Sequence, residues 1–97
     1  MKFYLELYCD GIRVRLVSGQ ADTNLRKHGI TFKFTTRVFE DPNRTEGLDD
    51  RDYQDEQRWV TTGQAAEFVL TVVFTLRKEA IRLISARRAT RRKLYDY

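Results

Sequence analysis

Three β-rich runs lie close together in the second half of the chain, and they constrain the fold more than any other feature. They occupy residues 58–62, 67–77 and 80–87, and each contains β-branched or aromatic residues. The gaps between them are short and carry glycine or charged residues, which is typical of hairpin connections. The sequence therefore predicts an antiparallel meander of three strands.

The first part of the chain predicts a hairpin. Residues 2–8 alternate between apolar and polar side chains, and residues 12–16 do so cleanly. Between the two runs stands Asp10-Gly11, a dipeptide that favours a tight turn. Two short strands joined in this way form a second antiparallel pair.

A helix is expected next. Its start is capped by Asp22 or Ser18, and Gly29 stops it after a basic last turn. Residues 31–40 leave two readings open, because their phenylalanines and Val38 fit the alternation of a strand or one face of a helix. Residues 41–55 have the composition of a loop, and residues 89–97 predict a short helix.

These elements indicate an α+β fold, in which N-terminal helices pack on one face of an antiparallel sheet and a short helix ends the chain. At 97 residues the chain makes a single domain, residues 1–97. Cys9 and His28 are the only residues of their types, which argues against a disulfide, a zinc cluster or another transition-metal site within one chain. No apolar run approaches the length of a membrane span, so we expect a cytoplasmic protein without membrane contact.

Charge is unevenly distributed along the chain. Residues 1–39 carry a net charge of +4, residues 40–56 carry −6, and residues 57–97 carry +6. Two basic parts separated by an acidic segment indicate an anionic partner for the basic surface. The acidic segment is then a loop or a contact for something basic.

Alternation predicts where the polar residues of the first meander strand point. If Trp59 faces the core, then Glu56 and Arg58 lie together on the opposite, open face. Two residues apart on a strand, both can reach one phosphate group. The simpler interpretation is a solvated sheet face with cross-strand ion pairs, and from the residues alone it is favoured about two to one.

The third meander strand follows the same rule. Ile81 and Leu83 facing the core would put Arg82 on the open face. By the same alternation, Ser85 and Arg87 would lie on the core face with Ile81 and Leu83.

Lys27-His28-Gly29 is the second candidate feature. Cations in the last turn of a helix are favoured by the helix dipole, and glycine ends the helix, so structure alone explains the triplet. In a functional reading, Lys27 offers a charge for a phosphate. Histidine is the only side-chain type that ordinarily gains or loses a proton near neutral pH, which makes His28 a candidate for proton transfer. The spacing gives the two readings about equal weight.

A basic run near the end of the chain favours polyanion binding. Six of its twelve residues are basic and none is acidic, and Tyr95 follows as a ring on which an exposed base can stack. We expect RNA contacts from Arg88, Arg91, Arg92 and Tyr95.

Several motifs are specific when taken together. They are NLRKHGITF at 24–32, VFEDP at 38–42, EQRW at 56–59, Gly63, the strand 69–75 and IRLISAR at 81–87, followed by Ala89, Arg92 and Tyr95. Over residues 24–97 the chain resembles the BrnT toxins of bacterial type II toxin–antitoxin modules. Residues 1–23 and the segment KFTT at 33–36 depart from that pattern.

The resemblance implies a RelE-like α+β fold and an endoribonuclease that needs no metal or other cofactor. It implies neutralisation by a BrnA-like antitoxin, a dimeric DNA-binding protein through which the complex binds operator DNA. The residues that match the family's site are Lys27, Glu56, Arg58 and Arg82, with His28 and Arg87 as further candidates.

For RNA cleavage we hypothesise Glu56 as general base, Arg58 and Arg82 as phosphate ligands, and Lys27 or His28 near the leaving group. Two other function classes stay open. One is a nucleic-acid binder that does not cleave, and the other is a module whose surface serves chiefly to dock an antitoxin.

Overall fold

A mixed six-stranded sheet frames the molecule in the computed structural model, which describes residues 4–9, 11–49, 56–77 and 80–97. In spatial order β1-β2-β6-β5-β4-β3, its strands are β1 (Tyr4–Cys9), β2 (Ile12–Val17), β6 (Ala80–Arg88), β5 (Phe68–Arg77), β4 (Arg58–Ala65) and β3 (Thr45–Asp49). The fold is α+β as predicted. The sheet is not purely antiparallel, however, because β2 and β6 run parallel.

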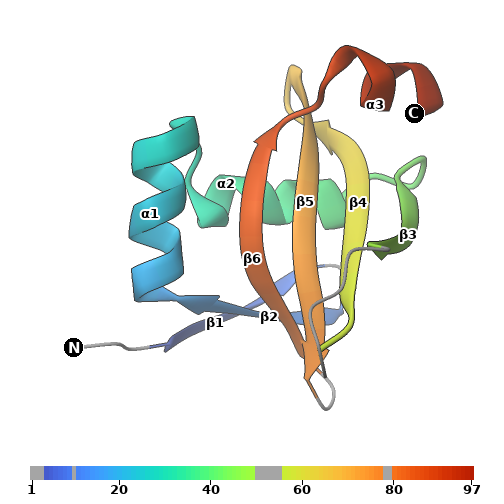
Figure 1. Ribbon diagram of the computed structural model, residues 1–97. Helices are drawn as coiled ribbons and strands as arrows, with labels where there is room; N and C mark the ends of the chain where they lie inside the picture. The colour runs from blue at the N-terminus through green and yellow to red at the C-terminus, as the bar shows by residue number, and fades with distance from the viewer. Residues whose placement is uncertain (1–3, 10, 50–55, 78–79) are drawn as a thin grey trace.

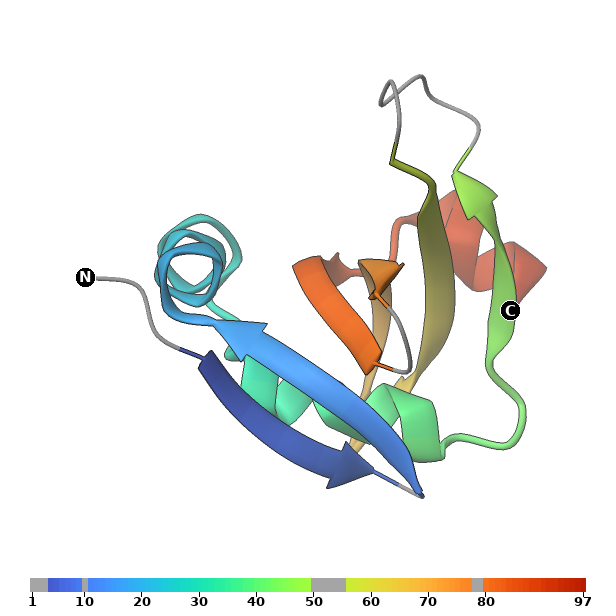
Figure 2. The same ribbon diagram turned by 90° about the horizontal axis from the view of Figure 1, so that it is seen from below.

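The helices occupy different sides of this sheet (Figures 1 and 2). They are α1 (Ser18–His28), α2 (Phe32–Thr35), the 3-10 helix η1 (Thr36–Glu40) and α3 (Arg91–Asp96). The α2–η1 segment covers the rear of β4–β6, whereas α3 lies near β3 at the other end of the chain. The expectation that all N-terminal helices share one face is wrong for α1, which stands beside β6.

The edge of β6 explains the position of α1. β2 pairs with β6 only from Arg13 to Arg15, and the chain then turns directly into the helix. Beyond that point Asn24 takes the place of a neighbouring strand, because its Oδ1 accepts the backbone N–H of Ala86 at 2.8 Å. A backbone N–H of a strand points along the sheet, so α1 continues the sheet rather than covering its face.

The core lies between the rear of β4–β6 and the α2–η1 segment. Its largest fully buried apolar side chains are those of Phe32, Phe39, Leu70, Leu83, Val14, Val38 and Val72. The rings of Phe39 and Phe74 meet edge to face at 5.5 Å. Residues 32–40 are helical, since Thr31 caps the first turn through Phe34 N–H and the resulting turns bury Phe32, Val38 and Phe39 together.

Two local predictions were wrong and one was confirmed. Residues 45–49, expected to be loop, form the edge strand β3, which pairs with β4 from Thr45↔Thr62 to Asp49↔Arg58. The N-cap of α1 is Val17, without a side-chain hydrogen bond, rather than Ser18 or Asp22. Gly29 does end the helix, in the left-handed conformation at φ 69°. Residues 50–55 of the predicted loop lie outside the described part of the chain.

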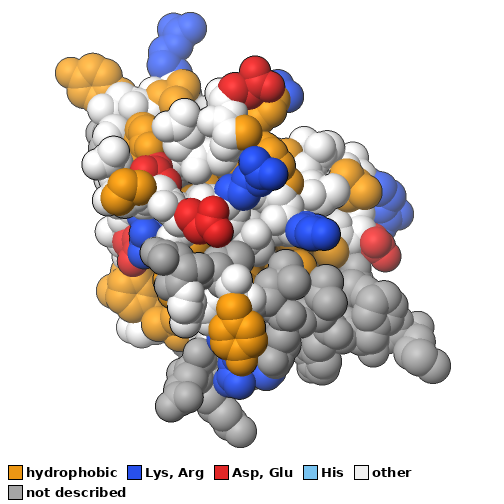
Figure 3. All heavy atoms as spheres, turned by 180° about the vertical axis from the view of Figure 1, so that it is seen from behind, with side chains coloured by type: hydrophobic (Ala, Val, Ile, Leu, Met, Phe, Trp, Pro, Cys, Tyr) orange, Lys and Arg blue, Asp and Glu red, His pale blue; other side chains and the backbone are white. Residues whose placement is uncertain are grey.

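Among the described residues, no helix has the length and apolar character needed to cross a membrane. On the rear face, Lys and Arg side chains are interspersed with acidic and apolar ones (Figure 3).

Candidate functional site

Arg58 and Arg82 lie on the same face of the sheet. Trp59 opposes Phe74 and Thr75 opposes Arg82, so the two arginines stand on either side of Thr75. Because neighbouring strands are about 4.8 Å apart, their Cα atoms are about 10 Å apart. Ile81 and Leu83 are buried in the core and Trp59 packs against it, as the alternation predicted.

Glu56 and Arg58 form an ion pair at the start of β4. Arg58 Nη2 lies 3.5 Å from Glu56 Oε2, and their side chains are 26% and 30% exposed. The carboxylate is therefore held beside a guanidinium and is partly open to solvent. Such a pair can serve a reaction or simply stabilise a half-exposed surface.

A β-bulge changes which residues of β6 face this side. Val73 opposes Ser85, but Phe74 opposes Leu83, so Ile84 is an extra residue on β6. The bulge reverses the alternation beyond it: Ala86 is buried in the core, and Arg87 opposes Thr71 on the other face. The prediction that Ser85 and Arg87 share a side with Leu83 is wrong, and the correction puts Arg87 on the face of Arg82.

The end of α1 brings Lys27 and His28 to the same region. Asn24 is 3% exposed, accepts from Ala86 N–H, and donates to the carbonyl of Ile30 at 3.1 Å. These two bonds fix the last turn of α1 against β6. The exposed Lys27 and His28 consequently lie beside the strand that carries Arg82 and Arg87.

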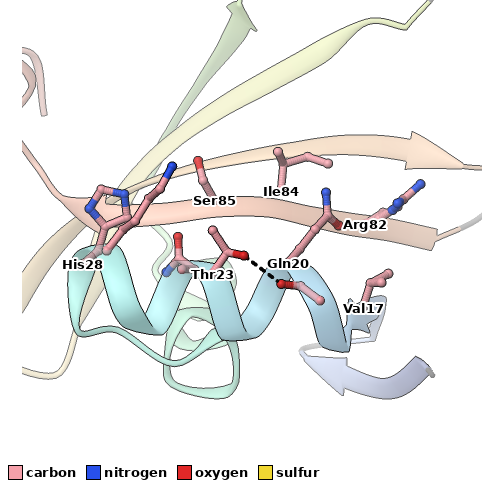
Figure 4. A pocket seen from close by; sticks show the side chains of 10 residues that line it. Val17, Gln20, Thr23, His28, Arg82, Ile84 and Ser85 are labelled. Atoms are coloured by element: carbon pink, nitrogen blue, oxygen red, sulfur yellow. Dashed lines mark hydrogen bonds between the residues drawn. The ribbon is translucent and has the colours of Figure 1, made fainter. Parts of the chain in front are cut away.

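We call the space between α1 and β6 the α1 groove. Its volume is about 490 Å³, and it is lined by Val17, Gly19, Gln20, Thr23, Asn24, Lys27 and His28 together with Arg82, Ile84 and Ser85 of β6 (Figure 4). Three candidates, Lys27, His28 and Arg82, thus share one concave site. Two cations and an imidazole around a groove favour an anionic ligand.

A second hollow, the sheet groove, adjoins the first. It has a volume of about 340 Å³ and is lined by His28, Asp49, Val60, Thr71, Val73, Ser85, Arg87 and Lys93. His28 and Ser85 line both grooves, so the two meet at these residues. Arg87 and Lys93 make the far wall basic, and Asp49 contributes an acidic group.

The basic run near the end of the chain does not form one patch. Arg88 opposes Leu70 on the core side, and its guanidinium lies 4.9 Å from the centroid of the Phe68 ring. On α3, Arg91, Arg92 and the 92% exposed Tyr95 point into solvent, whereas Lys93 lines the sheet groove. RNA contacts from Arg88, Arg91, Arg92 and Tyr95 stay a prediction.

Asp41 fastens α3 to the body of the protein. Its carboxylate accepts hydrogen bonds from the Tyr97 hydroxyl and from the backbone N–H groups of Gln64 and Asn43. Burial raises the pKa of this carboxyl, but the hydrogen bonds outweigh it and hold the pKa below its ordinary value. The bond to Asp41, followed by burial, raises the pKa of Tyr97.

Some groove residues were not indicated by the sequence. Gln20, Thr23 and Ser85 belong to no spacing pattern, and they enter the site only through the direction of α1 and the bulge in β6. Among the described residues, no three His, Cys, Asp or Glu side chains cluster closely enough to hold a metal ion.

Comparison with known proteins gives a match that spans nearly all the residues of the two grooves. A family model described as "Ribonuclease toxin, BrnT, of type II toxin-antitoxin system" matches residues 18–93. No curated protein matches the chain. The matched range runs from the first residue of α1 to Lys93, and therefore includes nearly every residue that lines the two grooves.

Proposed function

The chain belongs to the BrnT family of ribonuclease toxins from type II toxin–antitoxin systems, and from this premise we propose that it cleaves RNA on the sheet face that carries Arg58 and Arg82, beside the α1 groove. The observation that carries the proposal is the meeting of Lys27 and His28 from α1 with Arg82 from β6 in one groove. The family supplies an RNA substrate and an antitoxin partner in general terms. The residues, the mechanism and the identity of the antitoxin are our proposal.

In the proposed reaction no metal takes part. Glu56 accepts the proton of a ribose 2′-OH, and the 2′-oxygen forms a bond to phosphorus while the bond from phosphorus to the 5′-oxygen breaks. Arg58 and Arg82, on either side of Thr75, stabilise the negative charge that develops on the phosphate oxygens. Lys27 or His28 gives a proton to the departing 5′-oxygen.

The Glu56–Arg58 pair supports this assignment. The Glu56 carboxylate lies 3.5 Å from the Arg58 guanidinium, so a proton acceptor stands beside a group that binds phosphate. Arg87 and Lys93 in the sheet groove extend the basic surface for the neighbouring phosphates.

Cleavage in the presence of EDTA tests the proposal. We expect the wild-type protein to cut single-stranded RNA, Glu56→Gln to lose about 10²–10⁴-fold in rate, and Arg82→Ala to lose about 10²–10³-fold. Glu67→Gln and Arg37→Ala are matched controls, because both residues are exposed and lie outside the two grooves. Full activity in either site variant would refute the role of that residue.

A second candidate function is RNA binding without cleavage. The same ion pair favours it, since Glu56 has a cationic partner whether or not a substrate is present. In the assay above this candidate gives salt-sensitive RNA binding and no product, with or without EDTA.

We further propose that the fold is RelE-like, that the protein acts in the cytoplasm, and that a BrnA-like DNA-binding antitoxin neutralises it. The exposed basic residues of α3 and the basic grooves suit an acidic segment of such a partner. Adding the purified antitoxin should abolish cleavage at a one-to-one ratio, and an unchanged rate would exclude direct neutralisation.

A further inference from the structure

The α1 groove contains hydrogen-bonding side chains that the proposed cleavage does not use. Gln20 reaches from α1 toward β6 beside Arg82, and Thr23 and Ser85 lie further along the groove toward His28 (Figure 4). Thr23 Oγ1 donates to the carbonyl of Gly19 at 3.0 Å, which leaves its oxygen lone pairs available as acceptors.

The bulge in β6 gives the groove its mixed lining. In a regular strand only alternate residues face one side, but Arg82, Ile84 and Ser85 all line this groove. β-Bulges near functional sites re-aim side chains in this way. The result is a basic group, an apolar group and a hydroxyl within four residues.

Two polar atoms at this groove lack partners. Oε1 of Gln20 and Nε of Arg82 are buried, and neither has a hydrogen bond within the described part of the protein. Buried polar groups are nearly always hydrogen-bonded in folded proteins. Each of these two groove-lining side chains therefore keeps one hydrogen-bonding atom that a ligand can satisfy when the side chain turns toward the groove. Val17 and Ile84 provide apolar walls.

We propose that the α1 groove is a nucleobase subsite, which holds one unstacked base of a single-stranded RNA next to the cleaved phosphate. This inference rests on the proposed function. Its volume of about 490 Å³ lies within the range of small-molecule sites. A base offers a donor and an acceptor side by side on its edge, and the carboxamide of Gln20 is complementary to such a pair. Val17 and Ile84 contact its faces, and Arg82 with Lys27 binds the adjoining phosphate.

The position of Gln20 supports a role in specificity rather than in chemistry. It lies on α1 beside Arg82, but its carboxamide is not an acid, a base or a cation, so it takes no part in the proposed proton transfers or charge stabilisation. A carboxamide at this place distinguishes bases through hydrogen bonds to their edges. Gln20 is accordingly a specificity residue and not a catalytic one.

Binding of short 2′-O-methyl RNA tests the inference without cleavage, because such RNA lacks the attacking hydroxyl. Fluorescence anisotropy at fixed salt would compare hexamers of adenine, uracil and cytosine. We expect the wild-type dissociation constants to differ by at least about tenfold. Gln20→Ala should narrow that range to about threefold and leave the salt dependence unchanged, since no phosphate contact is lost.

Gln64→Ala is the matched control, because Gln64 is an exposed glutamine that donates to the carbonyl of Ala66. It should preserve the wild-type preference. Equal affinity of the wild-type protein for the three hexamers, or a preference that Gln20→Ala leaves intact, would overturn the subsite. Failure to bind any hexamer would also overturn the subsite. If, in addition, longer RNA were not cleaved in EDTA, the proposed function itself would be wrong.

Discussion

Asn24 is the residue that joins the helical and strand parts of the site. Its amide satisfies two backbone groups at once, the N–H of Ala86 and the carbonyl of Ile30, and its side chain is almost completely buried. Truncation would leave both groups without a partner in a place that water does not reach. The energetic role of Asn24 is therefore larger than that of an ordinary surface amide.

We expect Asn24→Ala to lower the free energy of unfolding by about 2–4 kcal/mol, since each unsatisfied buried group costs about 1–3 kcal/mol. Urea denaturation measures this loss. Asn43→Ala, which changes an exposed asparagine, should stay within about 0.5 kcal/mol of the wild type. Similar small effects in both variants would contradict the anchoring role of Asn24.

Gly63 shows a second constraint at single-residue scale. A Cβ at this position would lie 2.7 Å from Val38 Cγ1 and 3.0 Å from Arg44 Cβ, so β4 and η1 pack here without room for a side chain. Gly63→Ala should destabilise the protein by about 1–3 kcal/mol through overpacking. Gly47→Ala in β3 meets nothing within 4 Å and should be neutral or slightly stabilising. Equal stability of the two variants in urea would show that η1 moves away at no cost.

Among the elements, α3 has a polar contact to the body of the protein directly after its last residue. The Tyr97 hydroxyl donates to the Asp41 carboxylate, and this bond places the helix so that Lys93 lines the sheet groove. The pKa of Asp41 lies below its ordinary value of 3.8, and the pKa of Tyr97 lies above its ordinary value of 10.0. The hydrogen bond therefore forms fully only at a pH above the pKa of Asp41 and below the pKa of Tyr97.

The signs of the two shifts predict the pH dependence. Because the pKa of Asp41 is lowered on folding, its contribution to stability is present above pH 3.8 and is lost as pH falls through the folded value. Because the pKa of Tyr97 is raised, its contribution is present below pH 10.0 and is lost as pH rises through the folded value. Tyr97→Phe should remove the dependence at high pH and weaken the one at low pH, because the backbone N–H groups of Gln64 and Asn43 still bind Asp41. Urea midpoints across pH would show both changes. A wild-type and a variant curve of the same shape would argue against the contact.

The elements also differ in how far the sequence determines them. Alternation and turn residues predicted β1, β2, β4, β5 and β6, and Gly29 predicted the end of α1. β3 was missed because an exposed edge strand needs no apolar alternation, and its sequence TEGLD resembles a loop. The helical form of residues 32–40 follows from tertiary burial, which local spacing does not reveal.

For the site, alternation predicted that Arg58 and Arg82 share a face, and the register agrees. The alternation placed Arg87 on the wrong face, because the extra residue Ile84 reverses the faces of β6 beyond it. A bulge of this kind leaves no mark in a single sequence when the extra residue is apolar. The sequence likewise gave no sign that Gln20 and Ser85 belong to the site, since only the packing of α1 beside β6 brings them together.

At the scale of the whole molecule, the same bulge divides the basic run between two faces. Arg87 lines the sheet groove with His28 and Lys93, whereas Arg88 lies on the core side over Phe68. Adjacent arginines thus provide a matched pair for testing which face RNA contacts. If RNA binds across the grooves, Arg87 neutralises a phosphate and Arg88 does not, contrary to the expectation from the sequence that Arg88 contacts RNA.

The salt dependence of RNA affinity separates the two residues. Each phosphate contact on a single strand contributes about 0.7 to the slope of log affinity against log salt. We expect Arg87→Ala to weaken binding and reduce the slope by about 0.7, and Arg88→Ala to leave the slope unchanged, as fluorescence anisotropy between about 50 and 200 mM salt would show. Equal reductions would mean that RNA follows the continuous basic run around the edge of the sheet. In that case the grooves would not define the RNA path, and the division of charge between the two faces would have no bearing on binding.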